Sequence, residues 1–168
     1  IEQVTQDLIE QIIPNGSPVP RPGFSSFITT GSTTASTLAS TAASIASPQR
    51  YMHTAFNFLE ELSLQWLAEM CCIKGMQGVY SSGGSVANLV ALGGARQFAF
   101  EKTGHDPSAD GVNRQALVYA SEECHHTIQR SCGVLGLGRH AVRLIACDDE
   151  GRMHPGALKR AITEDHSS

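Results

Sequence analysis

The sequence predicts an α/β fold built on a parallel sheet, and two observations support this. From residue 78 onward, short apolar segments typical of buried strands alternate with longer segments whose apolar residues recur at helical spacing. Such a strand–helix–strand–helix–strand order is typical of parallel sheets joined by right-handed crossovers. The composition agrees, because 41% of the 168 residues are hydrophobic, which is enough to form a core.

Composition also excludes several classes of protein. The formal net charge is −4, whereas a nucleic-acid-binding protein carries a basic surface. No apolar stretch reaches about 18 residues, so no membrane span is expected, and the first residues do not resemble a signal peptide. Only 17% of the residues are charged. We therefore expect much of the surface to meet other protein, either another subunit or a further part of the same chain.

The five cysteines form no Cys-x-x-Cys pair, which argues against a zinc ribbon or a thioredoxin-like redox site. We expect reduced, mostly buried thiols in a cytoplasmic protein.

Two helices are predicted before residue 50. Apolar residues at helical spacing indicate a helix over residues 1–13, which Pro14-Asn15-Gly16 ends. Residues 22–49 carry no charge and are rich in Ser, Thr and Ala. This composition fits either a low-complexity linker or a packed helix at an interface. A serine at every fourth position from Ser32 to Ser44 favours the helix.

The elements of the α/β region follow in order. Residues 51–70 are the clearest amphipathic helix, with apolar side chains on one side and glutamates mostly elsewhere. The remaining predictions are a strand over 78–81, a buried, nearly uncharged helix over 86–100, a surface loop over 102–115, a strand over 116–120, a helix over 126–135, a strand over 141–147 and a helix over 155–164.

The first candidate site is Ser82-Gly83-Gly84-Ser85, between the strand over 78–81 and the next helix. Free amides at a helix N-terminus, glycines that allow close approach and a serine hydroxyl together form a phosphate cradle. The sequence is neither a Walker A loop nor GxGxxG, so it does not specify a nucleotide. A tight turn in which Ser85 is an ordinary N-cap explains the same residues equally well.

The second candidate is His125, which follows the strand over 116–120, where open α/β sheets bind ligands. An imidazole there can stack on a planar cofactor, titrate near neutrality or bind a metal, or it can simply cap the next helix. No metal site is expected, because adjacent side chains in Cys124-His125-His126 diverge and no further ligands converge. Thr29 and Thr30 beside Phe27 fit either a substrate pocket or a helix cap.

Other residue types offer less. His154 before Pro155 fits an N-cap-type position, and none of the three lysines, Lys74, Lys102 and Lys159, has the apolar surroundings of a catalytic amine.

Five motifs in order resemble the pyridoxal-phosphate-dependent group II amino-acid decarboxylases, a family that includes the aromatic amino-acid, tyrosine, histidine and glutamate decarboxylases. They are Arg21-Pro22-x-Phe24 with Phe27-Ile28-Thr29, Phe58-Leu59-Glu60 through Trp66-Leu67, Ser82-Gly83-Gly84-Ser85-Val86-Ala87-Asn88-Leu89, Ser121-Glu122-Glu123-Cys124-His125, and Asp149-x-Gly151-Arg152-Met153-x-Pro155-x-Ala157-Leu158.

The resemblance implies a fold and a cofactor. The fold would be part of the large domain of the aspartate-aminotransferase-like fold (fold type I). Residues 1–49 would form a helical and extended segment at the dimer interface and substrate side, and residues 50–168 the first part of the cofactor-binding α/β domain. Gly84 and Ser85 would bind the phosphate of pyridoxal 5'-phosphate, His125 would stack on its ring as the catalytic residue, and Thr30 and Phe27 would lie near the substrate.

The implied activity is decarboxylation of an L-amino acid to its amine and CO₂ by a homodimer. The sequence departs from the family at Val86, in place of an acidic residue, at His126, in place of a small hydroxyl residue, and at His154, in place of an aspartate. It also contains no His-Lys dipeptide of the kind that carries the family's Schiff-base lysine. We therefore expect this chain to be the N-terminal part of the enzyme, inactive without its C-terminal part.

Three alternatives remain open at this point. One is another lyase or an aminotransferase of fold type I, and a second is a non-catalytic phosphate-binding module. The third is a purely structural role, in which the uncharged region 22–49 serves subunit assembly.

Overall fold

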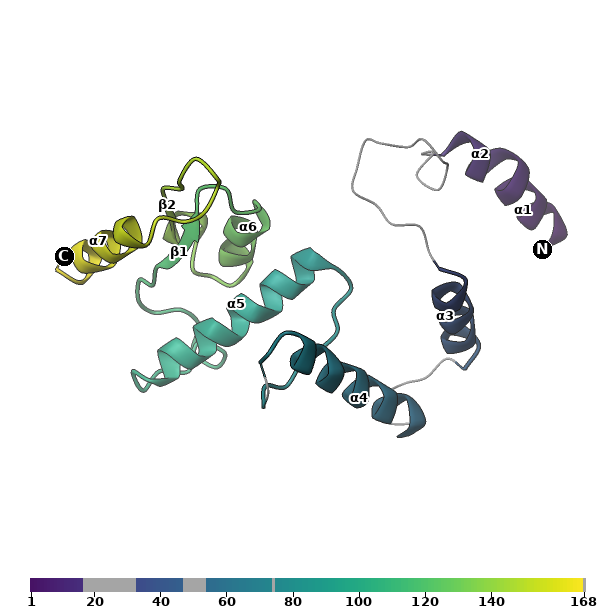
Figure 1. Ribbon diagram of the computed structural model, residues 1–168, viewed down its shortest axis with the longest axis horizontal. Helices are drawn as coiled ribbons and strands as arrows, with labels where there is room; N and C mark the ends of the chain where they lie inside the picture. The colour runs from purple at the N-terminus through teal and green to yellow at the C-terminus, as the bar shows by residue number, and fades with distance from the viewer. Residues whose placement is uncertain (17–32, 47–53, 74, 168) are drawn as a thin grey trace. The chain divides into compact units, whose positions relative to one another are not determined.

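The computed structural model describes residues 1–16, 33–46, 54–73 and 75–167 (Figure 1). They form two compact units, Ile1–Gly78 and Val79–Ser168. The boundary predicted between residues 49 and 50 lies outside the described residues and stays a prediction.

The first unit begins with the predicted N-terminal helix. It consists of α1 (Glu2–Asp7), a π-helical stretch (Leu8–Ile12) and α2 (Ile13–Asn15) in direct succession. The helix continues past its predicted end, and Pro14 lies at the junction where the π-helical stretch passes into α2. It ends at Gly16, whose amide donates to the Ile13 carbonyl at 3.2 Å.

The uncharged segment forms helix α3 (Thr34–Ala46), so the helix is confirmed and the low-complexity linker is wrong for these residues. Thr33 caps it, because its Oγ1 accepts from the Ser36 amide at 3.1 Å. No α3 side chain is buried, and the predicted place of this helix at an interface stays a prediction.

Helix α4 (Thr54–Met70) confirms the predicted amphipathic helix, and its C-terminus has a Schellman geometry. The Ile73 amide donates to the Ala68 carbonyl at 2.9 Å, and the Cys72 amide donates to the Glu69 carbonyl at 3.1 Å. Cys72 takes the left-handed conformation, with φ of 58°, that glycine usually supplies at this position. The helix therefore ends in a defined turn rather than by fraying.

The strand predicted over residues 78–81 is wrong. These residues pair with no strand in the described part of the chain. A Cβ placed on Gly78 would lie 2.8 Å from Leu64 Cδ2, so this backbone approaches α4 closely instead. An apolar extended segment becomes a strand only when a neighbouring strand supplies hydrogen bonds, and sequence periodicity does not indicate that neighbour.

The second unit contains the predicted α/β pattern. Its elements are α5 (Gly84–Glu101), β1 (Val118–Ser121), α6 (Thr127–Val134), a 3₁₀ turn (Arg139–Ala141), β2 (Val142–Ile145) and α7 (Pro155–His166). Strands β1 and β2 are parallel, in a register that pairs Val118 with Val142 and Ser121 with Ile145. Helix α6 provides the crossover that a parallel pair needs. The predicted cap at His154 is confirmed, because its Nδ1 accepts from the Gly156 amide at 3.1 Å.

The core of the second unit lies where its helices meet the two strands. Each element contributes a side chain to it: Phe100 from α5, Ala120 from β1, Cys132 from α6, Ile145 from β2 and Ala161 from α7. These side chains are small apart from Phe100 and Ile145, so the elements approach one another closely.

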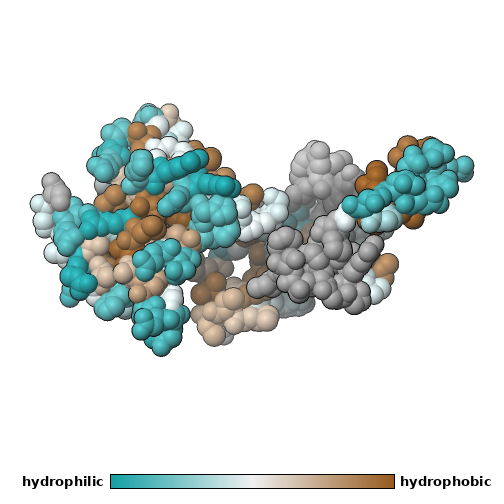
Figure 2. Space-filling view, turned by 90° about the horizontal axis from the view of Figure 1, so that it is seen from above, coloured by the Kyte–Doolittle hydropathy of each residue, from teal (hydrophilic) through white to brown (hydrophobic). Residues whose placement is uncertain are grey.

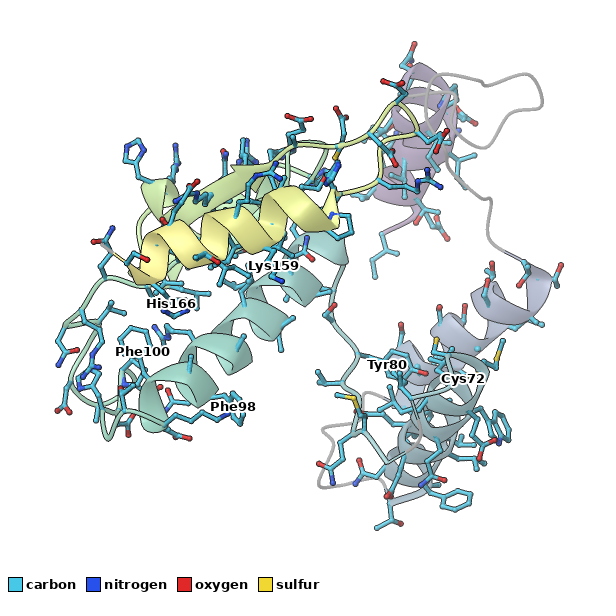
Figure 3. The ribbon with its side chains drawn as sticks, turned by 60° about the vertical axis from the view of Figure 1, so that its left-hand side comes forward. Cys72, Tyr80, Phe98, Phe100, Lys159 and His166 are labelled. Atoms are coloured by element: carbon cyan, nitrogen blue, oxygen red, sulfur yellow. The ribbon has the colours of Figure 1, made fainter. Side chains whose placement is uncertain are left out.

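Two burial predictions are wrong. Helix α5 was expected to be buried, but Phe100 is its one buried residue. Phe100 is 3% exposed and Phe98 is 62% exposed, and the two rings point to different sides of the helix (Figure 3).

The second of these predictions concerns the thiols, which were expected to be mostly buried, but only the Cys132 thiol is. Cys124 and Cys147 are half-buried, and Cys71 and Cys72 are exposed. Burial depends on the neighbours that a segment meets, which local periodicity does not specify.

Many apolar side chains of the described residues remain exposed. They occur on α1, α4 and α5, and brown apolar atoms lie between the teal polar ones on the face seen in Figure 2. This pattern matches the expectation that much of the surface meets other protein.

Candidate functional site

Helix α5 opens with three backbone amides that lack a helical acceptor. Gly83 is its N-cap, and no side chain caps the helix. The first helical bond runs from the Ala87 amide to the Gly83 carbonyl at 2.9 Å, so the amides of Gly84, Ser85 and Val86 come before it. The aligned peptide dipoles place about half a positive charge at this end.

The space in front of these amides is open among the described residues. A Cβ placed on Gly83 or Gly84 would meet no atom within 4 Å, and Gly83 has φ of 152°, which other residues rarely adopt. Ser85 is also exposed. Because Gly83 is the N-cap and Ser85 lies inside the helix, the alternative that made Ser85 an ordinary N-cap is wrong. The free amides, the hydroxyl and the positive helix end fit a phosphate ester.

His125 lies in the turn before α6 and is tied to α5 by a hydrogen-bonded chain. Its Nδ1 is 2.9 Å from Thr127 Oγ1 and 3.3 Å from the Thr127 amide nitrogen. Asn88 Nδ2, on α5, donates to the same Thr127 Oγ1 at 2.7 Å. Thr127 is 4% exposed, whereas the His125 side chain is exposed. The ring is therefore held from one edge and open elsewhere.

A second bond shows that α5 and α6 run in the same direction. Arg96 Nη1, further along α5, donates to the Leu135 carbonyl at the end of α6 at 2.8 Å. The Asn88–Thr127 and Arg96–Leu135 pairs are both separated by 39 positions, so the two helices keep one register and Figure 1 shows them next to one another. Their N-termini consequently lie at the same end, which brings His125 to the end where α5 opens.

The side chains of Cys124-His125-His126 were expected to diverge, and for the two histidines this is wrong, because His126 lies against His125. The ring centroids are 4.1 Å apart and the planes are inclined by 33°. Loss of hydration, the neighbouring His125 and the positive charge of Arg130 lower the pKa of His126. His126 is therefore favoured in its neutral form, which removes charge repulsion from the paired rings.

The structure brings Gly84, Ser85 and His125 to one end of the α5–α6 pair, as the sequence analysis requires. Phe27 and Thr30 lie outside the described residues. The predicted absence of a desolvated lysine holds for Lys102 and Lys159, which are exposed, the latter on α7 (Figure 3). The roles assigned to Gly84, Ser85, His125, Thr30 and Phe27 toward a cofactor and substrate stay predictions.

Sequence reasoning assigned no role to Asn88 and Thr127. A signal was present for both, because Asn88 belongs to the glycine-serine motif and Thr127 is two residues after His125. The contact between them was not recognised, because residues 39 positions apart show no periodic relation.

A second polar contact joins the ends of the two strands, where Ser121 Oγ and Cys147 Sγ are 2.9 Å apart.

The described residues contain neither a cluster suited to a metal ion nor a helix suited to crossing a membrane. In the described ranges, no three His, Cys, Asp or Glu side chains are grouped as a metal site would need. Among the same residues, no helix combines the length and apolar character that crossing a membrane requires.

Comparison with known proteins identifies the family. The family described as "Pyridoxal-dependent decarboxylase conserved domain" matches residues 1–168, the whole chain. The chain belongs to this family. The resemblance in the five motifs is thereby confirmed, and so is the pyridoxal cofactor at the level of the family.

Individual relatives show how much of the family fold is present. Cysteine sulfinic acid decarboxylase of Mus musculus is 33% identical over 111 residues, 64% of this chain and 21% of the relative. Aromatic-L-amino-acid decarboxylase of Bacillus atrophaeus is 34% identical over 110 residues, 65% of this chain and 21% of the relative.

A solved structure confirms the fold. The glutamate decarboxylase domain of a diaminobutyrate-pyruvate transaminase and L-2,4-diaminobutyrate decarboxylase from Vibrio parahaemolyticus has a TM-score of 0.91 at 21% identity, and the match covers 99% of this chain and 38% of that one. The aligned region is thus about a fifth of each curated relative and under half of the solved chain. The predicted fold class, part of the large domain of the pyridoxal-dependent decarboxylases, is confirmed.

Proposed function

We propose that the whole protein decarboxylates an amino acid with pyridoxal 5'-phosphate, and that the end of the α5–α6 helix pair holds the cofactor. The observation that carries this proposal is the open N-terminus of α5 at Gly84 and Ser85, with His125 at the same end, in a chain of the pyridoxal-dependent decarboxylase family. An anion-binding end next to an exposed aromatic ring suits a cofactor with a phosphate and a planar ring.

Each residue of the site would have a separate role. The amides that open α5 and the Ser85 hydroxyl would hold the phosphate by charge-assisted hydrogen bonds. The exposed ring of His125, fixed at Nδ1 by Thr127, would lie against the cofactor ring and keep it in one plane. When bound, the cofactor supplies an electron sink for the pair that CO₂ leaves behind. Water would be kept from the buried edge of this site by Thr127, which is 4% exposed.

We also propose that residues 1–168 alone are inactive and that catalysis needs the C-terminal region of the same enzyme. The described lysines are exposed, and no His-Lys dipeptide occurs in the sequence. The relatives are about five times longer than the region they share with this chain, so the covalent attachment of the cofactor is assigned to the part that the match does not cover.

Residues 1–49 are assigned to subunit contact and to the substrate side. The exposed apolar side chains in the described part of this segment include Ile9, Ile12, Leu38 and Ile45, which supports burial against a partner copy. We propose a homodimer, with Phe27 and Thr30 near the substrate. Sedimentation of the whole protein should give twice the monomer mass, and a monomer at micromolar concentration would contradict the dimer.

The compartment proposed is the cytoplasm. All five cysteines are free, including the half-buried Cys124 and Cys147, as is usual where thiols stay reduced.

The reaction is tested with the whole protein, pyridoxal 5'-phosphate and a panel of acidic and aromatic amino acids. Both classes are needed because the relatives named for cysteine sulfinic acid and for aromatic amino acids match at nearly equal identity. Release of CO₂ with one equivalent of amine supports decarboxylation. Formation of the keto acid without CO₂ would instead show an aminotransferase.

A matched pair of variants locates the reaction at this site. His125→Ala should lower turnover at least about a hundredfold, since a positioned group contributes factors of this size. His140→Ala, an exposed histidine of the same unit, should leave turnover unchanged. Equal turnover in the two variants would show that His125 has no part in catalysis.

A further inference from the structure

The chain Asn88–Thr127–His125 has one consistent direction of hydrogen-bond donation. A backbone amide can only donate, and the Thr127 amide points at His125 Nδ1 at 3.3 Å. Nδ1 is therefore an acceptor, and the proton of the neutral ring lies on Nε2. The Thr127 hydroxyl, 2.9 Å from the same Nδ1, must then donate to it as well.

Asn88 completes the same direction. A hydroxyl has one proton to donate, and Thr127 gives it to His125, so its Oγ1 is left to accept. Asn88 Nδ2 donates to this oxygen at 2.7 Å. Each group in the chain thus donates toward the imidazole, and no group has to use one proton twice.

The burial of Thr127 and Asn88 favours this one hydrogen-bond arrangement over alternatives in which water takes part. Thr127 is 4% exposed and Asn88 is half-buried, so water does not compete freely for Oγ1. Thr127 is also the first residue of α6, and Asn88 lies one turn into α5. The chain therefore connects the orientation of the ring to the two helices that form the site.

We infer that Asn88 and Thr127 are positioning residues, which hold His125 in the tautomer with Nε2 protonated and fix its ring relative to the opening of α5. The tautomer and the hydrogen bonds follow from the residues of this protein alone. Only the action of the ring on a bound cofactor or substrate rests on the proposed function. A fixed ring with an N–H at its free edge offers a planar surface and one hydrogen-bond donor to the bound cofactor or substrate.

The tautomer can be measured without cofactor or activity. The whole protein is labelled with ¹⁵N-histidine and studied without cofactor at about pH 8.5, where an ordinary imidazole is neutral. The resonances of His125 are identified by their loss in His125→Gln. Wild type should show Nδ1 unprotonated and Nε2 protonated. A protonated Nδ1 in wild type would overturn the inference.

Three variants separate the contributions. Thr127→Val keeps the shape but removes the hydroxyl, so only the longer contact from the residue 127 amide, at 3.3 Å, is left to hold Nδ1 unprotonated. The fraction of His125 with Nε2 protonated should therefore fall, and Thr127→Ser should restore it. Asn88→Asp replaces a donor by an acceptor, which turns the Thr127 hydroxyl away from Nδ1 and should give the same fall. Asn113→Asp is the matched control, because Asn113 Nδ2 contacts His105 Nδ1 at 3.1 Å in the loop after α5 and should leave His125 unchanged.

A second readout uses the cofactor. Thr127→Val and Asn88→Asp should each weaken pyridoxal 5'-phosphate binding about three- to tenfold and reduce its induced circular dichroism, while Thr127→Ser stays near wild type. If Thr127→Val is as well folded as wild type and keeps both the tautomer and the dichroism, the inference is wrong. If the tautomer responds as expected but wild type releases no CO₂ from any amino acid, the proposed function fails and the positioning chain stands.

Discussion

Ser85→Ala separates binding from folding at the opening of α5. The Ser85 side chain is exposed, and its hydroxyl has no hydrogen bond among the described residues. Alanine is also the better helix former, by a few tenths of a kcal/mol. The free energy of unfolding should therefore change by less than about 0.5 kcal/mol.

Cofactor affinity should respond much more. A hydrogen bond from a hydroxyl to a phosphate dianion contributes about 1.5–3 kcal/mol, since the acceptor is charged. At 1.36 kcal/mol per factor of ten, the dissociation constant of pyridoxal 5'-phosphate should rise about 10- to 150-fold. All three free amides, those of residues 84, 85 and 86, remain in place and retain part of the binding.

The assay is equilibrium dialysis of the whole protein, freed of cofactor, against pyridoxal 5'-phosphate, with urea unfolding of the same samples. Ser44→Ala is the matched control, because among the described residues the Ser44 hydroxyl donates to the Ser40 carbonyl of its own helix at 2.8 Å. It should change neither quantity measurably. A Ser85→Ala dissociation constant within twofold of wild type would refute the phosphate site at this helix end.

Three further predictions concern the second unit. Gly83→Ala forces a side chain into φ of 152° and should destabilise the opening of α5 by about 1–3 kcal/mol, measured by urea unfolding. Phe100→Ala removes a 3% exposed ring and should cost about 3–5 kcal/mol in the same assay, while Phe98→Ala, 62% exposed, should cost less than about 1 kcal/mol. The backbone and side chain of Arg152 hydrogen-bond to Asp148 and lower its pKa, so this carboxylate stabilises the fold above about pH 4, and the stability difference between wild type and Asp148→Asn should vanish as the pH falls further.

Each of these has an outcome that contradicts it. A free energy of unfolding for Gly83→Ala equal to that of wild type would show that the backbone conformation of Gly83 does not constrain the opening of α5. Equal unfolding midpoints for Phe98→Ala and Phe100→Ala would mean that the core does not form around α5. A stability difference for Asp148→Asn that is independent of pH between 2 and 7 would show that the charge of this residue does not matter.

The sequence by itself determined the local elements of this protein. Helical spacing predicted α4 and α7, the serine recurrence predicted α3, and the residue before Pro155 predicted the His154 cap. Each of these depends on contacts within a few residues, where the chain's own pattern carries the information. The glycine-serine motif likewise identified where α5 begins, because the start of a helix depends on the local backbone conformation.

Tertiary structure decided which of these segments have partners. Residues 78–81 have the pattern of a strand but pair with no strand in the described part of the chain, and the backbone at Gly78 closely approaches Leu64 of α4 instead. Helix α5 has the composition of a buried helix but buries Phe100 alone. The hydrogen bond between Asn88 and Thr127 joins residues 39 positions apart. Pairing, burial and long-range hydrogen bonds depend on which surfaces meet in space, and periodicity along the chain carries no information about that.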